Sequence, residues 1–157
     1  ATLMASSITA ATLTLTITES VTLNCSDQGS TNTHTIASVN EVFKRIVSCP
    51  ASNTTTLAVF SSTVHGAAGA IDIQDAKYIR ITNVDDTNTL ELAFVGAATL
   101  YQVALRAGES HILGSPDDLM LAEADTSPSF GTMAYLSSIQ ANPGGNNIDL
   151  EVFVASV

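Results

Sequence analysis

The sequence is poor in several residue types that functional classes depend on. It has no tryptophan, two cysteines, four prolines and five Lys and Arg residues among 157, against 15 Asp and Glu, which gives a formal net charge of −10. Binding nucleic acid through its phosphates needs a basic surface, so no nucleic-acid partner is expected. No stretch approaches the roughly 18 consecutive apolar residues of a membrane helix, so no membrane partner is expected either.

The hydroxyl residues and the alternating pattern carry the fold prediction. Threonine (20) and serine (17) make up nearly a quarter of the chain, and 45% of the residues are hydrophobic, enough for one domain with a core. From Leu13 to Leu23 apolar residues share one parity, while threonines take the other over residues 12–18. A period of two indicates a half-buried strand with threonine on its wet face.

Further short runs of strand type follow, separated by turn residues, and long amphipathic helices are absent from the pattern. The predicted strands cover residues 41–49, 55–62, 77–83, 89–95, 100–106, 110–113, 119–124, 132–141 and 148–155, and residues 26–35 read as a polar loop. Eight to ten short strands at this spacing predict an all-β fold, an antiparallel β-sandwich of jelly-roll type. A barrel is the nearest rival, because the sequence does not fix strand order.

The domain organisation predicted is simple. Residues 1–10 are small and weakly patterned, so they are expected to form an extended N-terminal arm, and residues 11–157 to form a single sandwich domain. The chain shows no repeat of fixed period and no dividing linker. Phe43, Phe60, Phe94 and Phe153 lie inside apolar runs and are expected in the core.

The residues that commonly carry chemistry do not form a recognisable constellation. His34, His65 and His111 lack metal-ligand spacing, and neither Cys25 nor Cys49 has a neighbouring Cys or His. Both cysteines are expected to be buried thiols without a bridge. No catalytic, cofactor-binding or metal-binding residue is therefore predicted, no cofactor is expected, and the chain is predicted not to be an enzyme.

Two acidic pairs and two glycine pairs are candidate sites. Asp85-Asp86 and Asp117-Asp118 have oxygen ligands suited to calcium, or to paired-acid glycoside cleavage. Asp is also an ordinary turn residue, and turn formation is the favoured interpretation. The segments at residues 66–69 and 144–145 do not precede a helix as a phosphate-binding loop requires.

Three stretches of the sandwich stand out as a set: KRIVSCPASNTTTLAVFSS (residues 44–62), KYIRITNVDDTNTLELAF with YQVALRAGESHIL (residues 77–113), and IDLEVFVAS (Ile148–Ser156). Together they resemble small accessory virion proteins of tailed bacteriophages, especially those of marine bacteria and cyanobacteria. These stretches span 19, 37 and 9 residues, together 65 of the 157 in the chain. The likeness marks strands and turns only, so no functional residue is carried over.

The resemblance implies a structural role. The expected function is that of a capsid decoration or cement subunit, which binds the major capsid protein, self-associates as a homotrimer and stabilises the assembled capsid. The expected location is the outer capsid surface of a virion assembled in the host cytoplasm. The alternative is a module of a head or tail appendage that binds a host surface or a carbohydrate. A reducing cytoplasm also implies unbridged cysteines.

Overall fold

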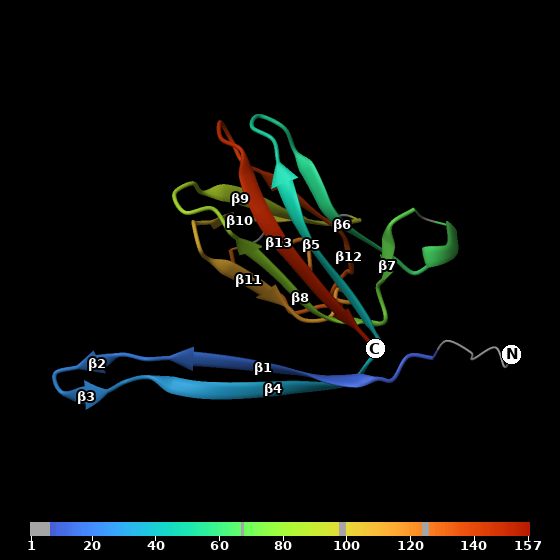
Figure 1. Cartoon of the computed structure of the whole chain (residues 1–157). Coiled ribbons are helices and arrows are strands. Elements are labelled where there is room, and N and C mark those ends of the chain that lie inside the picture. The colour runs from blue at the N-terminus through green and yellow to red at the C-terminus, as the bar shows by residue number, and fades with distance from the viewer. Residues whose placement is uncertain (1–6, 67, 98–99, 124–125) are drawn as a thin grey trace, which may run out of the picture.

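The computed structural model describes residues 7–66, 68–97, 100–123 and 126–157, and these residues form an all-β protein. Two sheets face each other in a sandwich, and a long hairpin lies against one end of it (Figure 1). The hairpin strands are β1 (Ala11–Glu19), β2 (Thr22–Leu23), β3 (Ser26–Asp27) and β4 (Ser30–Val39). The predicted fold class is confirmed.

The sandwich begins at β5 and uses most of the remaining chain. Its elements, in chain order, are β5 (Glu41–Cys49), β6 (Thr55–Ser61), the 3-10 helix η1 (Val64–Gly66), β7 (Ala70–Asp72), β8 (Ala76–Asn83), β9 (Leu90–Gly96), β10 (Leu100–Leu105), β11 (Ser110–Leu113), β12 (Leu136–Asn142) and β13 (Ile148–Ser156). One sheet has the order β10-β9-β12-β6-β7 and the other β11-β8-β13-β5.

This strand order is that of a jelly roll. The first and last sandwich strands pair with each other, β5 with β13, and the pairs β6 with β12, β8 with β11 and β9 with β10 are nested inside. Such nesting is the pattern of one long hairpin rolled up into two sheets. The added strand β7 pairs in parallel with β6, which makes the five-stranded sheet mixed where an antiparallel sheet was expected.

The inward-facing side chains of both sheets form the core, as alternation along each strand requires. The largest fully buried residues are Phe94, Leu57, Ile79, Ile81, Leu90, Leu92, Leu136, Ile139, Ile148, Leu150, Val152 and Val154. Phe60 is buried as expected, and Phe43 is half-buried against this core. Phe153 differs, because it lies in a second cluster with Tyr78 beneath the hairpin.

Four sequence predictions need correction. Residues 26–35 are not a polar loop, because they contain β3 and most of β4. Residues 119–123 form no strand; Met120 makes only an isolated bridge to Ala134, and β12 starts at Leu136. The boundary at residue 11 is the start of the hairpin, while the sandwich starts at Glu41. Of the predicted arm, residues 1–6 lie outside the described residues, and residues 7–10 are exposed and precede β1.

One buried polar residue secures the end of the sandwich where β8, β9 and β10 meet. The Asn83 side chain is fully buried, and its Nδ2 donates hydrogen bonds to the carbonyl oxygens of Asn88 (2.9 Å) and Leu105 (3.0 Å). Its Oδ1 accepts one from the backbone N–H of Asp85 at 3.0 Å. The Asn83 amide therefore links the turn between β8 and β9 to the end of β10.

We expect Asn83→Leu to destabilise the fold by about 2–4 kcal/mol, because the substitution leaves the buried Leu105 carbonyl, the part-buried Asn88 carbonyl and the Asp85 N–H without their partner. Chemical denaturation measures the free energy of unfolding. Asn53→Ala is the matched control, since the exposed Asn53 amide donates one hydrogen bond to the carbonyl of Ala51. Equal losses in the two variants would show that Asn83 has no special structural role.

Candidate functional site: the projecting hairpin

The hairpin has two chemically different faces, which its register defines. On one face lie Leu13, Leu15 and Ile17, opposite Ile36, His34 and Asn32 of β4; we call the apolar residues Leu13, Leu15, Ile17 and Ile36 the hairpin stripe. The other face pairs threonine with threonine, Thr14 with Thr35, Thr16 with Thr33 and Thr18 with Thr31; we call these six residues the threonine face.

The base of the hairpin is anchored on the outer face of the four-stranded sheet. Leu13, Leu15 and Ile36 are half-buried against a cluster that contains Tyr78, Phe153 and Ala155. The Tyr78 and Phe153 rings meet edge to face, with centroids 5.8 Å apart. A crevice of about 190 Å³ remains between hairpin and sheet, lined by Leu13, Thr14, Leu15, Tyr78, Arg80 and Phe153.

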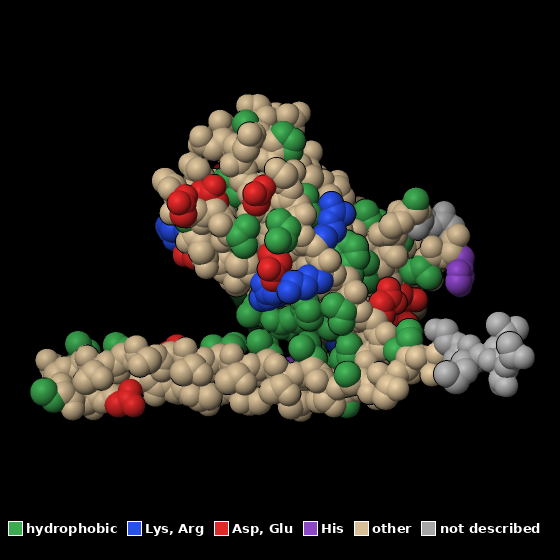
Figure 2. Space-filling view, in the orientation of Figure 1, with side chains coloured by type: hydrophobic (Ala, Val, Ile, Leu, Met, Phe, Trp, Pro, Cys, Tyr) green, Lys and Arg blue, Asp and Glu red, His purple; other side chains and the backbone are tan. Residues whose placement is uncertain are grey.

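For the distal half of the hairpin, the described residues provide no such packing. This half runs away from the sandwich to one side (Figure 1), and apolar side chains lie along its surface (Figure 2). Ile17 is 45% exposed, Val21 48% and Leu23 62%. Within the described residues, β1 and β4 pair with each other alone, so both outer edges of this two-stranded sheet are open.

The sandwich protects its edges, and the hairpin does not. Three sandwich edge strands are short, at three residues in β7, four in β11 and six in β10, while the long edge strand β5 carries Lys44 and Arg45. Short length and Lys are common devices against unwanted strand pairing. The hairpin strands have nine and ten residues, with no Lys, Arg or Pro in residues 11–39.

Local sequence explains the turn at the tip. Asn24 and Cys25 have positive φ angles of 50° and 63° between the paired strands β2 and β3. Two such residues are the signature of a type I′ turn, for which Asn is favoured at the first position. Cys25 occupies the position that Gly usually takes. An Asn-Gly pair would have predicted a hairpin turn here, whereas Asn24-Cys25 is not a recognised turn sequence.

The tip placement of Cys25 corrects one prediction. Cys25 is exposed, whereas Cys49 is buried in the sandwich core as expected. Burial is the main reason that the pKa of the Cys49 thiol lies above its ordinary value. The two thiols are free in the structure.

The three histidines lie apart from one another. His34 is on β4, His65 in η1 and His111 on β11, where its ring lies 4.9 Å from that of Phe94 and burial lowers its pKa. Among the residues that the structure describes, no group of three or more His, Cys, Asp or Glu side chains is arranged to hold a metal. No helix in the described part of the chain is long and apolar enough to cross a membrane.

The first acidic pair has a turn-forming role. Asp85 Oδ1 accepts hydrogen bonds from the backbone N–H groups of Thr87 (2.8 Å) and Asn88 (2.6 Å), and Asp86 Oδ1 accepts one from the Thr87 hydroxyl (3.0 Å). The backbone hydrogen bond from Asn88, followed by that from Thr87, holds the pKa of Asp85 below its ordinary value. In the second pair, Asp118 has a positive φ of 55° and the Asp117 N–H donates to Ser115.

The comparisons with known proteins give little for this chain. No family model matches it, and no curated protein matches it. A solved structure described as "Bacillus endospore appendages form a novel family of disulfide-linked pili" aligns with 9% sequence identity and a TM-score of 0.38, covering 74% of this chain and 88% of that one. A likeness at this level carries no functional argument.

Gly29 provides a test of the hairpin geometry. A Cβ atom at this position would lie 2.1 Å from the backbone oxygen of Glu19, a contact that the paired strand prevents from relaxing. We expect Gly29→Ala to disrupt the hairpin beyond Glu19, seen as faster hydrogen exchange of residues 16–33, with unchanged exchange in the sandwich. Gly114→Ala is the control, because that position has open space around it. Unchanged exchange in Gly29→Ala would contradict this geometry.

The Asp85 turn predicts a pH effect. Its folded-state pKa is lowered, so its contribution to stability is present above the unfolded-state pKa and disappears as the pH falls through the folded-state pKa. We expect Asp85→Asn to lower stability at pH 7 and to flatten the acid limb of the curve below about pH 4. Thermal unfolding from pH 2 to 7 measures this, with Asp149→Asn as the control. Parallel acid limbs in wild type and Asp85→Asn would contradict the turn role.

Proposed function

We propose that this chain is a structural subunit that attaches to an assembled protein shell, specifically a decoration or cement subunit on the outer capsid of a tailed bacteriophage. The observation that carries the proposal is the hairpin, whose distal half leaves the body of the protein with two open edges and exposed apolar side chains. The sequence resemblance to accessory virion proteins supports the choice of particle.

The physical argument concerns the stability of a hairpin without a third strand. An isolated two-stranded hairpin is at best marginally stable in water, and it needs further strands or a packed face. The base of this hairpin has the Tyr78 and Phe153 cluster, but among the described residues no equivalent cluster covers the segment beyond Ile17. A neighbouring subunit that covers an edge or a face of that segment would order it, in the manner of strand addition.

The threonine face suits contact with a capsid protein. Its methyl groups offer apolar area, and its hydroxyls form hydrogen bonds across an interface without the desolvation cost of charged groups. In this proposal the major capsid protein is the partner of the threonine face. Binding the assembled lattice more tightly than separated capsid subunits stabilises the lattice by linkage, and repetition over many sites makes weak contacts effective.

A second candidate function rests on a different surface. The outer face of the five-stranded sheet has a cavity of about 380 Å³ lined by Glu91, Gln102, Gln140 and Asn142 together with apolar side chains. Amide and carboxylate groups are suited to sugar hydroxyls, and the volume lies in the range of small-ligand sites. This favours the alternative of a carbohydrate-binding module on a head or tail appendage.

Attachment to particles tests the first proposal. The double variant Thr16→Glu/Thr33→Lys places opposite charges at a directly paired position of the threonine face, so strand pairing is kept while burial of that face becomes costly. We expect wild-type protein to bind stripped phage particles and to raise their temperature of disruption. The double variant should bind at least about tenfold more weakly, which is about 1.4 kcal/mol.

The control Thr56→Glu/Gln140→Lys introduces the same charges at a paired position of the five-stranded sheet, where Gln140 lines the cavity. It should bind particles as wild type does. Loss of attachment in this control alone, accompanied by binding of wild type to a glycan array, would favour the carbohydrate-binding function. Failure of wild type to raise the disruption temperature would contradict the cement function.

A further inference from the structure

A second surface of the protein complements the hairpin stripe. On the outer face of the four-stranded sheet, β5 presents Val42, Lys44 and Ile46 in a row, because residues two apart point to the same side of a strand. Val42 is 54% exposed and Ile46 68% exposed, and Lys44 is exposed between them. This row is an apolar, cationic, apolar pattern on a protein whose net charge is −10.

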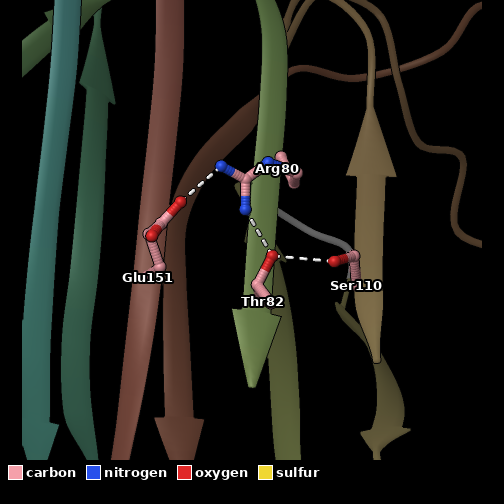
Figure 3. Close-up of polar contacts among 4 residues, drawn as sticks. All are labelled: Arg80, Thr82, Ser110 and Glu151. Carbon is pink, nitrogen blue, oxygen red and sulfur yellow. Dashed lines mark hydrogen bonds and ion pairs between the residues drawn. The ribbon is translucent and has the colours of Figure 1, made fainter. Parts of the chain in front are cut away.

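The neighbouring charges on this face are already paired. Arg80 Nη2 lies 2.5 Å from Glu151 Oε1, Arg80 also donates to the Thr82 hydroxyl, and the Thr82 and Ser110 hydroxyls are 2.7 Å apart (Figure 3). The hydrogen bond from Arg80 is the main cause that lowers the pKa of Glu151, and the charge of nearby Lys44 adds to it. Lys44 therefore lies near an ion pair, Arg80 with Glu151, whose charges already balance, and it is the exposed cation of the β5 row.

The hairpin carries the matching pattern. Glu19 follows Ile17 by two residues on the face of the hairpin stripe, opposite Ser30 of β4. Residues 1–43 contain no Lys or Arg, so the hairpin is purely acidic through Glu19 and Asp27. The separation of Ile17 from Glu19 and that of Ile46 from Lys44 are both two strand residues, about 6.8 Å. An apolar contact and an ion pair can thus form together in one alignment.

The chain already shows this type of contact at the hairpin base. There Leu13 and Leu15 of the hairpin stripe pack on Tyr78 and Phe153, which belong to the same outer sheet face as the β5 row. The distal stripe continues that surface, but it runs away from its own sandwich (Figure 1) and so does not reach its own β5 row. The β5 row can therefore meet Ile17 and Glu19 only when these residues belong to a second copy.

We propose that Ile17 and Glu19, which lie on the stripe face of the distal hairpin, dock on the β5 row of a second copy. Ile17 packs against Ile46 or Val42, and Glu19 pairs with Lys44. The contact is heterologous, because the two surfaces differ. Heterologous contacts close into rings when the rotation allows and otherwise form open chains. Reciprocal docking of two copies about a two-fold axis closes a dimer, and docking in one direction closes the predicted homotrimer or a larger ring. The inference deepens the proposed function by naming the partner of the stripe face.

Charge exchange in purified full-length protein tests the contact. We expect wild type to self-associate in sedimentation velocity without any capsid present. Lys44→Glu and Glu19→Lys should each weaken association by at least about tenfold, in line with measured couplings of close interfacial charge pairs. An equimolar mixture of these two variants should associate again into alternating dimers or chains, because each hairpin then meets an opposite charge on the other variant. A three-membered ring cannot alternate, so closed trimers should return only in the double variant Lys44→Glu/Glu19→Lys.

Three further variants separate the contact from effects on folding. Ile46→Ser removes an exposed apolar contact of the β5 row and should weaken association without lowering the melting temperature. In the wild-type protein the Ser30 hydroxyl donates to Glu19 Oε2 at 3.2 Å, and Glu19→Gln retains an acceptor for it. This variant should weaken association less than Glu19→Lys does. Arg106→Glu makes the same charge change as Lys44→Glu in the turn after β10, and should leave association unchanged.

The outcomes are distinct for this inference and for the proposed function. A wild-type protein that stays monomeric, or self-association that none of the substitutions at Glu19, Lys44 and Ile46 changes, overturns the inference. Absence of rescue in the mixture, when both single variants are folded, also overturns it. Capsid attachment without self-association would leave the proposed function standing alone, while self-association without capsid attachment would remove that function and keep this contact.

Discussion

The packing of the hairpin stripe on the outer face of the four-stranded sheet is the interaction on which the shape of this protein depends. A two-stranded sheet has no second layer of its own, so its apolar face must be covered from outside. Leu13, Leu15 and Ile36 meet this requirement at the base by packing on Tyr78, Phe153 and Ala155. Beyond Ile17 no part of the chain that the structure describes covers this face, and Ile17, Val21 and Leu23 are exposed as a result.

The jelly roll gives the hairpin a rigid support. Its nested pairing joins the two ends of the sandwich, since β5 and β13 are the first and last sandwich strands and lie side by side. The hairpin enters directly before β5, and the Asn40 N–H donates to the Ser156 carbonyl at 3.0 Å, close to the C-terminus. The hairpin therefore leaves the sandwich at the point where its first and last strands, β5 and β13, are paired. A projecting element attached there holds a defined direction relative to the body.

The edges of the strands show a division of labour between the two parts. In the sandwich, short edge strands and the charges of β5 limit pairing with other chains. In the hairpin, long edges without Lys, Arg or Pro leave pairing open. The outward faces of the two sheets also differ. On the four-stranded sheet Arg80 and Glu151 form an ion pair with each other, while the five-stranded sheet has a cavity lined by amide groups. Acidic side chains elsewhere, such as Asp85, serve turns by accepting backbone hydrogen bonds.

The sequence by itself determined the class of fold and most of the sandwich strands. Strict alternation and turn residues placed β5 and β11 at their observed bounds and β8, β9 and β13 within one or two residues, because burial of one face imposes a period of two. Tertiary structure alone decided the nested strand order, since the partners lie far apart in the chain and local pattern does not choose among them. It alone also revealed the hairpin: β4 is polar because it is solvated on both faces along most of its length, and a polar strand without alternation looks like a loop. The outward position of Phe153 has the same origin, because only the hairpin lying over that face makes an outward aromatic residue half-buried.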